Sequence, residues 1–292
     1  MSFLLCLGAL VLSYALYLPS LALSYAAGAI DYPTKRKTHA VPMARGGGFS
    51  FFAAFSAALF ASPVSAEFKI ALLVGGSVIF LVGFFDDCIS LSPPQKLAGQ
   101  FAAAATYIFI SGSDNLLLGF LTLAWTVYLT NAINLTDGLD GLAGGICSGE
   151  ALCLAIIALV FGHTDVTLAA SLLLFAVVGF LPRNFPHAKI FMGDCGALFL
   201  GFTLAVLSSR LVSDSGSLLC LFSVLLVFRL PTYDTNISII RRSVRGKNPF
   251  RADKEHFHHK LLNIGFTKEC AALALITASL ALGLVGVIIS TL

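Results

Sequence analysis

Residues Asn131–Gly145 read NAINLTDGLDGLAGG, and this polar stretch lies between two apolar runs, Phe120–Leu129 and Ile146–Phe161. A carboxylate at the centre of a membrane helix costs about 2.5–3.5 kcal/mol, so Asp137 and Asp140 beside such runs indicate a polar cavity rather than lipid contact. If the turn is helical, their spacing of three residues places both on one side of it. A glycine-rich loop that merely carries two acids is the alternative interpretation of this stretch alone.

The composition is that of an integral membrane protein. The 292 residues are 58% hydrophobic and 11% charged, with a mean hydropathy of +0.91, whereas soluble domains average about 25% charged residues. The seven cysteines are scattered without a CxxC pair, which favours small buried apolar residues over zinc binding or disulfides. The N-terminus has no basic region or A-x-A cleavage site, so Ser2–Tyr25 is expected to remain as a span.

We expect an all-α, polytopic membrane protein with one domain over residues 1–292 and about ten transmembrane helices. A helix needs about 17–25 apolar residues to cross a hydrocarbon core of ~30 Å. Such runs occur at about 2–25, 47–65, 68–85, 97–113, 115–133, 144–162, 165–182, 195–212, 215–231 and 269–290. Short polar tips separate several neighbouring runs on one side of the membrane, as in tight hairpins.

The loops on the other side are longer and basic. They cover about 31–45, 86–96, 134–142, 183–194 and 231–268. Of the eighteen Lys and Arg residues, only Lys69 and Arg210 fall on the side of the short tips. The positive-inside rule therefore predicts that the long loops are cytoplasmic and that both termini lie outside, since the number of spans is even.

The loop that reads FFDDCISLSPPQK carries two adjacent acids, Asp86 and Asp87, at the end of an apolar run. Adjacent carboxylates repel one another unless a cation lies between them, and Mg²⁺ prefers one or two carboxylates plus substrate phosphate oxygens. Lys96 opens the next run. Two solvated loop acids are the alternative interpretation.

The stretch RNFPHAKIFMGDCGALFLG places Asp194 at the start of an apolar run. A helix N-terminus favours an anion there, and Asp194 taken alone is explained as well by a helix N-cap. Arg183 and Lys189 in the preceding loop are candidates for binding phosphates.

The longest loop carries Asp234, a basic cluster that includes Arg251, and the histidines of HFHH. Residues Ile237–Val244 are expected to form a short amphipathic helix on the membrane surface. The histidine spacing differs from that of common zinc motifs. Phosphate contacts, a proton relay or structural hydrogen bonds are therefore favoured for these histidines (His256, His258 and His259).

Together these loops bring five acids to one face of a membrane domain. Because clustered acids without a cation are costly, a divalent metal bound together with a phosphorylated substrate explains them best. The residues alone therefore indicate a membrane enzyme or a transporter that handles a phosphorylated ligand at its cytoplasmic face.

Five motifs, in order, resemble those of the polyprenyl-phosphate N-acetylhexosamine-1-phosphate transferase family (glycosyltransferase family 4). They read DYPTKRKTHAVPMARGGG, FFDDCISLSPPQK, NAINLTDGLDGLAGG, PHAKIFMGDCGALFLGF and PFRADKEHFHHKLLNIG. The resemblance implies ten or eleven spans and a cytoplasmic active site. It also implies transfer of a sugar 1-phosphate from a UDP-sugar to a polyprenyl phosphate, with release of UMP and with Mg²⁺ or Mn²⁺ as cofactor.

The resemblance also implies roles for individual residues. Asp86 and Asp87 match the family's acidic pair, proposed to bind metal or to deprotonate the lipid phosphate, and Lys96 follows them. Asp194 matches the strongest metal-ligand candidate, which gives a predicted metal site of Asp194, Asp86 and Asp87. The expected substrate-binding residues are Asn134, Asp137, Asp140, Lys189, Arg251, His256, His258 and His259. Ala197 departs from the family, which often has Ser there.

The expected reaction is attack of the lipid phosphate on the β-phosphorus of the UDP-sugar. The lipid phosphate is already mostly ionised near pH 7, since its second pKa is about 6, so neither Asp86 nor Asp87 is required as a strong base. The expected partners are a UDP-N-acetylhexosamine, undecaprenyl phosphate and the bacterial inner (cytoplasmic) membrane. A homodimer is one hypothesis for the assembly, and nothing indicates nucleic acid.

UDP-GlcNAc is the favoured donor, and initiation of a lipid-linked cell-surface glycan such as O-antigen is the expected use. The phospho-N-acetylmuramoyl-pentapeptide transferase of peptidoglycan synthesis is the alternative within the family. A nucleotide-sugar transporter, a membrane scaffold and a CDP-alcohol phosphotransferase are alternatives from other classes. The last of these is expected to show a DGxxAR-type run, whereas DGLDGLAGG lacks the arginine.

Overall fold

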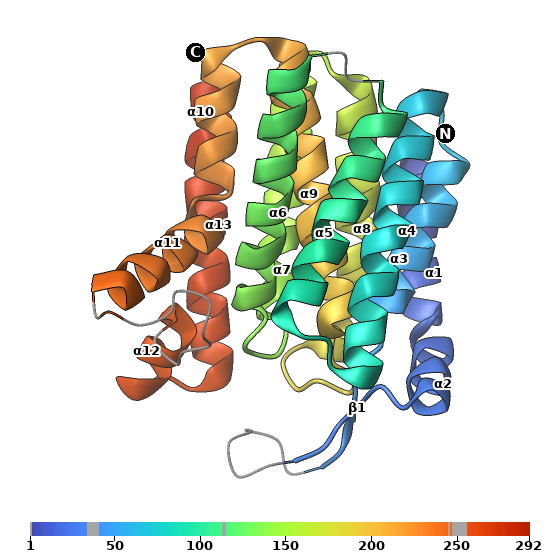
Figure 1. Ribbon diagram of the computed structural model, residues 1–292, viewed down its shortest axis with the longest axis vertical. Helices are drawn as coiled ribbons and strands as arrows, with labels where there is room; N and C mark the ends of the chain where they lie inside the picture. The colour runs from blue at the N-terminus through green and yellow to red at the C-terminus, as the bar shows by residue number, and fades with distance from the viewer. Residues whose placement is uncertain (1, 34–40, 113–114, 245, 247–255) are drawn as a thin grey trace.

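The protein is described here from a computed structural model that covers residues 2–33, 41–112, 115–244, 246 and 256–292. Helices account for almost all of its regular structure (Figure 1). In the described residues they are α1 (Ser2–Ala15), α2 (Tyr17–Ala27), α3 (Gly48–Phe60), α4 (Ala66–Ile89), α5 (Pro93–Ile110), α6 (Leu116–Thr136), α7 (Leu142–Val160), α8 (Thr164–Asn184), α9 (Gly193–Ser215), α10 (Leu218–Val227), α11 (Arg229–Val244), α12 (Phe257–Asn263) and α13 (Lys268–Ser290).

The helices confirm an all-α, multi-pass membrane protein. Among the described helices, six are long and apolar enough to cross a membrane, and the number rises to eight if each of two bent pairs counts as one span. Helix α3 is shorter and apolar, and α5 carries a polar first turn. The count of ten spans therefore stays a prediction.

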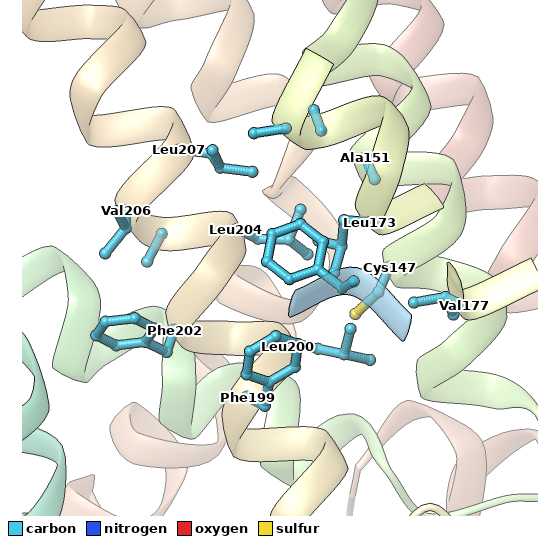
Figure 2. Packing of buried hydrophobic residues seen from close by; sticks show 14 of the residues in the cluster. Cys147, Ala151, Leu173, Val177, Phe199, Leu200, Phe202, Leu204, Val206 and Leu207 are labelled. Carbon is cyan, nitrogen blue, oxygen red and sulfur yellow. The ribbon is translucent and has the colours of Figure 1, made fainter. Parts of the chain in front are cut away.

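Helix α9 forms the centre of the bundle and is buried along most of its length. It packs against α4 and α6 on one side and against α3, α7 and α8 on others. Figure 2 shows part of this core, in which α9 meets residues of α7 and α8 (Leu200, Leu204 and Leu207 with Cys147, Ala151, Leu173 and Val177). Because Asp194 lies in the first turn of α9, the most buried of the described helices also positions the candidate site.

Two helices predicted as straight spans are broken, and a proline explains each break. Helices α1 and α2 meet at 46°, and α10 and α11 meet at 73°. Pro19 and Pro231 lack the N–H that would bond to the carbonyl four residues earlier, at Ala15 and Val227. The predicted span 215–231 is therefore wrong in its bounds, because α10 ends at Val227.

Helix α11 corrects a second prediction. The sequence indicated a short surface helix over Ile237–Val244, whereas the helix begins eight residues earlier, at Arg229. Thr232 stabilises the new start, since its hydroxyl donates to the carbonyl oxygens of Phe228 and Arg229 at 2.7 and 3.2 Å.

A small hairpin is the one feature of the described chain that departs from an all-helical architecture. Strands β1 (Ile30–Asp31) and β2 (Met43–Ala44) pair antiparallel, with Ile30 opposite Ala44. The hairpin lies at the end of the bundle that also carries the turns after α4, α6 and α8, and both chain termini lie at the other end (Figure 1). The structure therefore brings the long loops to one face, while the cytoplasmic location of that face stays a prediction.

Candidate active site

The acidic pair closes the last turn of α4, and its two members have different partners. Asp86 accepts a hydrogen bond from the backbone N–H of Leu91 at 2.7 Å and forms an ion pair with Lys96 at 2.5 Å. The first turn of α5 presents Lys96, and a capping box between Ser92 and Gln95 stabilises that turn. Asp86 is thus held at the site by the loop that joins α4 to α5.

Lys96 joins Asp86 to Asp194. Its ammonium group lies 2.6 Å from Oδ2 of Asp194, while the other carboxylate oxygen accepts a hydrogen bond from the side chain of Asn134 at 2.9 Å. These four residues come from α4, α5, α6 and α9, so the predicted cluster of Asp86, Lys96, Asn134 and Asp194 does assemble in three dimensions. A single cation between two carboxylates relieves their mutual repulsion.

Asp87 has another environment, because it holds the first turn of α9. Its two carboxylate oxygens accept the backbone N–H groups of Asp194 and Cys195 at 2.9 and 3.0 Å. The guanidinium of Arg45 lies 3.3 Å from Oδ1, and the Asp87 side chain is fully buried. An anion at a helix N-terminus satisfies N–H groups that have no partner within the helix. Asp87 therefore sets the position of Asp194.

The GD pair is built around a glycine that no other residue replaces easily. Gly193 has φ = +76°, and a Cβ atom there would collide with the carbonyl oxygen of Arg45 and with Oδ2 of Asp87. A left-handed backbone angle is also costly for residues with a side chain. The glycine thus allows the chain to approach Asp87 and Arg45 closely enough for the contacts that hold Asp194.

The triple glycine before α3 has a packing role of the same kind. Gly47 and Gly48 donate backbone hydrogen bonds to the carbonyl oxygens of Phe191 and Met192 at 3.0 and 2.8 Å. A Cβ atom on Gly48 would collide with the backbone of Gly196. The segment therefore aligns against the loop that precedes Asp194, and this contact brings Arg45 to the site.

The charges around Arg45 confirm its place among the acids. Although burial lowers the pKa of this guanidinium, the carboxylates of Asp87, Asp194, Asp31 and Asp86 raise it by more. Sequence reasoning placed Arg45 only in a basic loop. The signal that it belongs to the site is its position directly before the glycines that pack on the GD loop.

Asp137 and Asp140 have different surroundings in the DGLDG turn after α6. Burial raises the pKa of the Asp137 carboxyl to about 7, and the negative charges of Asp194 and Asp87 add to this effect. Asp140 instead accepts the backbone N–H of Ala188 at 3.0 Å. Asp137 therefore lies close to the acidic cluster, where a nearby cation or a hydrogen-bond acceptor would stabilise its carboxyl group. Asp140 instead holds the loop between α8 and α9 in place.

The histidine motif reaches the same turn from the far end of the chain. His256 and His258 are buried, and the His258 ring packs directly on Gly138, where a Cβ atom would collide with it. The rings of His258 and His259 lie 4.2 Å apart between centroids. The motif therefore forms one wall beside the DGLDG turn, and substrate binding by its histidines stays a prediction.

His258 makes the stability of the protein depend on pH. Burial, together with the nearby His259 and His256, lowers its pKa to about 4. The unfolded chain takes up a proton near pH 6.5 and the folded chain does not, so stability falls as the pH drops from about 6.5 to 4. We expect this fall in the free energy of unfolding at low pH, on the order of 2–3 kcal/mol in the wild type, to be absent in His258→Gln. The free energy of unfolding is measured in detergent at several pH values. His163→Gln serves as the control, and parallel pH curves for wild type and His258→Gln would contradict the prediction.

Two of the predicted phosphate-binding residues, Arg183 and Lys189, are not part of this cluster. The Arg183 guanidinium lies 4.7 Å from the ring centroids of both Tyr14 and Tyr17 and donates to the Tyr14 hydroxyl at 3.0 Å, so it fastens α8 to the bend between α1 and α2. Lys189 is exposed in the loop between α8 and α9. Arg251 lies outside the described residues.

The three carboxylates of the predicted magnesium site (Asp86, Asp87 and Asp194) have different contacts. In the part of the chain that the structure describes, no three His, Cys, Asp or Glu side chains converge as a ready-made metal site. Both oxygens of Asp87 accept backbone N–H groups of α9. The carboxylates of Asp86 and Asp194 instead share the ammonium group of Lys96, a side chain that a bound cation can replace, so these two carboxylates and the amide oxygen of Asn134 are the candidate donors. Such a set suits Mg²⁺, which binds one or two carboxylates and completes its shell with water and substrate phosphates.

Comparison with known proteins agrees with this arrangement. Residues 69–212, which include the acidic pair, the DGLDG turn and the GD aspartate, match the model of glycosyl transferase family 4. A probable undecaprenyl-phosphate N-acetylglucosaminyl 1-phosphate transferase of Bacillus subtilis (strain 168) is 35% identical over an alignment of 264 residues that covers 85% of this chain and 74% of the relative. The chain belongs to glycosyl transferase family 4.

Other members of glycosyl transferase family 4 match over similar lengths. The decaprenyl-phosphate N-acetylglucosaminephosphotransferase of Mycobacterium tuberculosis (strain H37Rv) is 35% identical, with 89% of this chain and 75% of the relative covered. A phospho-N-acetylmuramoyl-pentapeptide-transferase of Staphylococcus aureus (strain Newman) is 32% identical over 70% of this chain and 71% of the relative. The chain is thus a membrane transferase that is more similar to the N-acetylglucosamine enzymes than to the muramoyl enzyme.

Proposed function

We propose that this protein transfers N-acetylglucosamine 1-phosphate from UDP-GlcNAc to undecaprenyl phosphate and releases UMP, at the cytoplasmic face of a bacterial membrane. The observation that carries the proposal is the convergence of Asp86, Lys96, Asn134 and Asp194 from four helices at one end of the bundle. The names of the relatives in Bacillus subtilis and Mycobacterium tuberculosis support the same donor sugar and a polyprenyl-phosphate acceptor.

A groove in the side of the helical bundle supports a lipid acceptor. It encloses about 550 Å³ between α6, α10, α11 and α13, with apolar walls that include Trp125, Phe222 and Leu225. At the bend between α10 and α11 its lining becomes polar, where Arg229 and Asn236 lie. An apolar chain with one charged end fits such a groove, with the isoprenoid against the walls and the phosphate at the polar end.

Helix α6 links the groove to the acidic cluster. Tyr128 lines the groove and donates to Asn236 at 2.9 Å. Asn131 and Asn134 follow at steps of three residues on the same helix, and at 1.5 Å per residue Asn134 lies about 9 Å further along the axis. A lipid phosphate at the end of the groove would therefore lie close to the cluster at Asp194.

The chemistry is an in-line displacement at phosphorus. An oxygen of the lipid phosphate attacks the β-phosphorus of UDP-GlcNAc, the bond to the bridging oxygen breaks, and UMP leaves with that oxygen. Lys96 and Arg45 offset the negative charge of the phosphates, and Asn134 orients the Asp194 carboxylate. Mg²⁺ bound by Asp194 and Asp86 would supply further charge neutralisation on the diphosphate. Asp137 and His258 line the side of the site that we assign to the donor.

The proposal is tested with purified protein in detergent, undecaprenyl phosphate and Mg²⁺. UDP-GlcNAc, UDP-MurNAc-pentapeptide and UDP-6-deoxy-N-acetylhexosamines are supplied in turn, and UMP release is measured. We expect release with UDP-GlcNAc. Release with UDP-MurNAc-pentapeptide alone would indicate the muramoyl alternative, and transport of intact nucleotide-sugar into proteoliposomes without UMP release would indicate a transporter.

Removal of divalent metal is expected to stop the reaction. Since no three described His, Cys, Asp or Glu side chains converge as a metal site, a bound ion would be held partly by the substrate and would exchange readily. EDTA should lower UMP release to background, and excess Mg²⁺ or Mn²⁺ should restore it. Turnover that persists in EDTA would show that Lys96 and Arg45 suffice as cations.

A further inference from the structure

Asp234 in α11 has two contacts with the histidine motif, across 22 residues of sequence. Its Oδ2 lies 2.8 Å from Nδ1 of His256, and its Oδ1 accepts the backbone N–H of Phe257 at 3.1 Å. The pair is buried, with side-chain exposures of 11% for Asp234 and 6% for His256. A buried carboxylate that is fully engaged at the first residues of α12 determines where that helix begins.

We propose that Asp234 is a positioning residue, which fixes the ring orientation and the tautomer of His256 for the transfer reaction. This inference rests on the proposed function. An ionised carboxylate only accepts hydrogen bonds, so Nδ1 of His256 carries a proton and Nε2 is the nitrogen left to face other groups. The hydroxyl of Ser238 lies 3.4 Å from the same Nδ1 and limits rotation of the ring.

The contact also determines where His258 lies. The rings of His256 and His258 are nearly parallel, with centroids 6.0 Å apart and an angle of 5° between the planes. His258 in turn packs on Gly138 in the DGLDG turn. A displacement of His256 would therefore move the wall of the site that faces Asp137, although Asp234 itself belongs to another helix.

The substitution Asp234→Asn tests the tautomer directly. Asparagine keeps an oxygen for the N–H of Phe257 but presents an N–H to Nδ1 of His256, which must then become an acceptor. The proton moves to Nε2. Partners that orient functional histidines cost roughly 10- to 100-fold when they are replaced, so we expect UMP release to fall by at least about tenfold.

A double-mutant cycle separates positioning from a structural role. UMP release is measured for Asp234→Asn, His256→Ala and the double variant, with Asp165→Asn at the other end of the bundle as the control. If Asp234 acts through His256, its loss is absent in the His256→Ala background. If the double variant loses activity by the product of the two single losses, the inference is overturned. Wild-type activity of Asp234→Asn would overturn it as well.

A measurement without substrate distinguishes this inference from the proposed function. Proteins with ¹⁵N-labelled histidine are compared by NMR in detergent, and the His256 signal is assigned with His256→Ala. We expect a proton on Nδ1 in the wild type and on Nε2 in Asp234→Asn. An unprotonated Nδ1 in the wild type overturns the inference even if Asp234→Asn does not fold, whereas a wild type that releases no UMP overturns only the proposed function.

Discussion

Asp194→Asn is expected to lower kcat for UMP release on the order of a thousandfold. The carboxylate is the meeting point of the Lys96 ammonium and the Asn134 amide, and asparagine removes its charge while keeping its shape. The variant would lose both the anion that holds Lys96 and the donor that best suits a divalent metal. Its fold should persist, since the backbone N–H of residue 194 still donates to Asp87.

The measurement is kcat and thermal midpoint side by side, with Asp214→Asn as the matched control. Asp214 lies on the same helix α9, at its other end, where it pairs with Arg210 on the surface. That control should keep its activity, since exposed ion pairs contribute about 0–1 kcal/mol. Activity of Asp194→Asn within tenfold of the wild type would remove Asp194 from the site that we propose.

Asp87→Asn is expected to reduce both activity and stability, which sets it apart from Asp194→Asn. One of its two acceptor oxygens becomes an N–H group that faces a backbone N–H of α9, and Arg45 loses its charged partner. A buried hydrogen bond to a charged group is worth about 1.5–3 kcal/mol, so the thermal midpoint should fall by roughly 5 °C. Activity should fall about a hundredfold, because α9 presents Asp194 in a shifted position.

Asp86→Asn is the comparison that makes this result informative. Asp86 accepts a single backbone N–H, from Leu91, and otherwise contacts Lys96. Its replacement should therefore reduce activity with a smaller thermal effect. If Asp87 were instead the base that deprotonates the acceptor, Asp87→Asn would be inactive with an unchanged thermal midpoint.

The apolar runs predicted most helices well, because a run of sufficient length has few stable structures in a bilayer besides a helix. The helix breaks and the hairpin that the apolar runs did not predict have local causes. Pro19 and Pro231 break helices at positions where hydropathy alone continues, and the β1–β2 hairpin consists of two residue pairs, too few for any periodic pattern.

The candidate site was predicted as a set of residues whose roles came from the family resemblance rather than from contacts. Acids that follow separate apolar runs must meet at one face once the runs pack side by side, so Asp86, Asp137 and Asp194 were found together. Asp234 was noted only as one acid in a long loop, because the sequence does not indicate that it returns to His256.

The sequence by itself determined that this is a multi-pass membrane protein with an acidic, phosphate-handling face, since hydrophobicity and charge are properties of the chain. Only the tertiary structure decided that Asp86 contacts Lys96 while its neighbour Asp87 caps α9. The two are adjacent and chemically identical, and their roles differ because successive residues on a helix point about 100° apart. What each carboxylate meets there depends on helices that are distant in sequence.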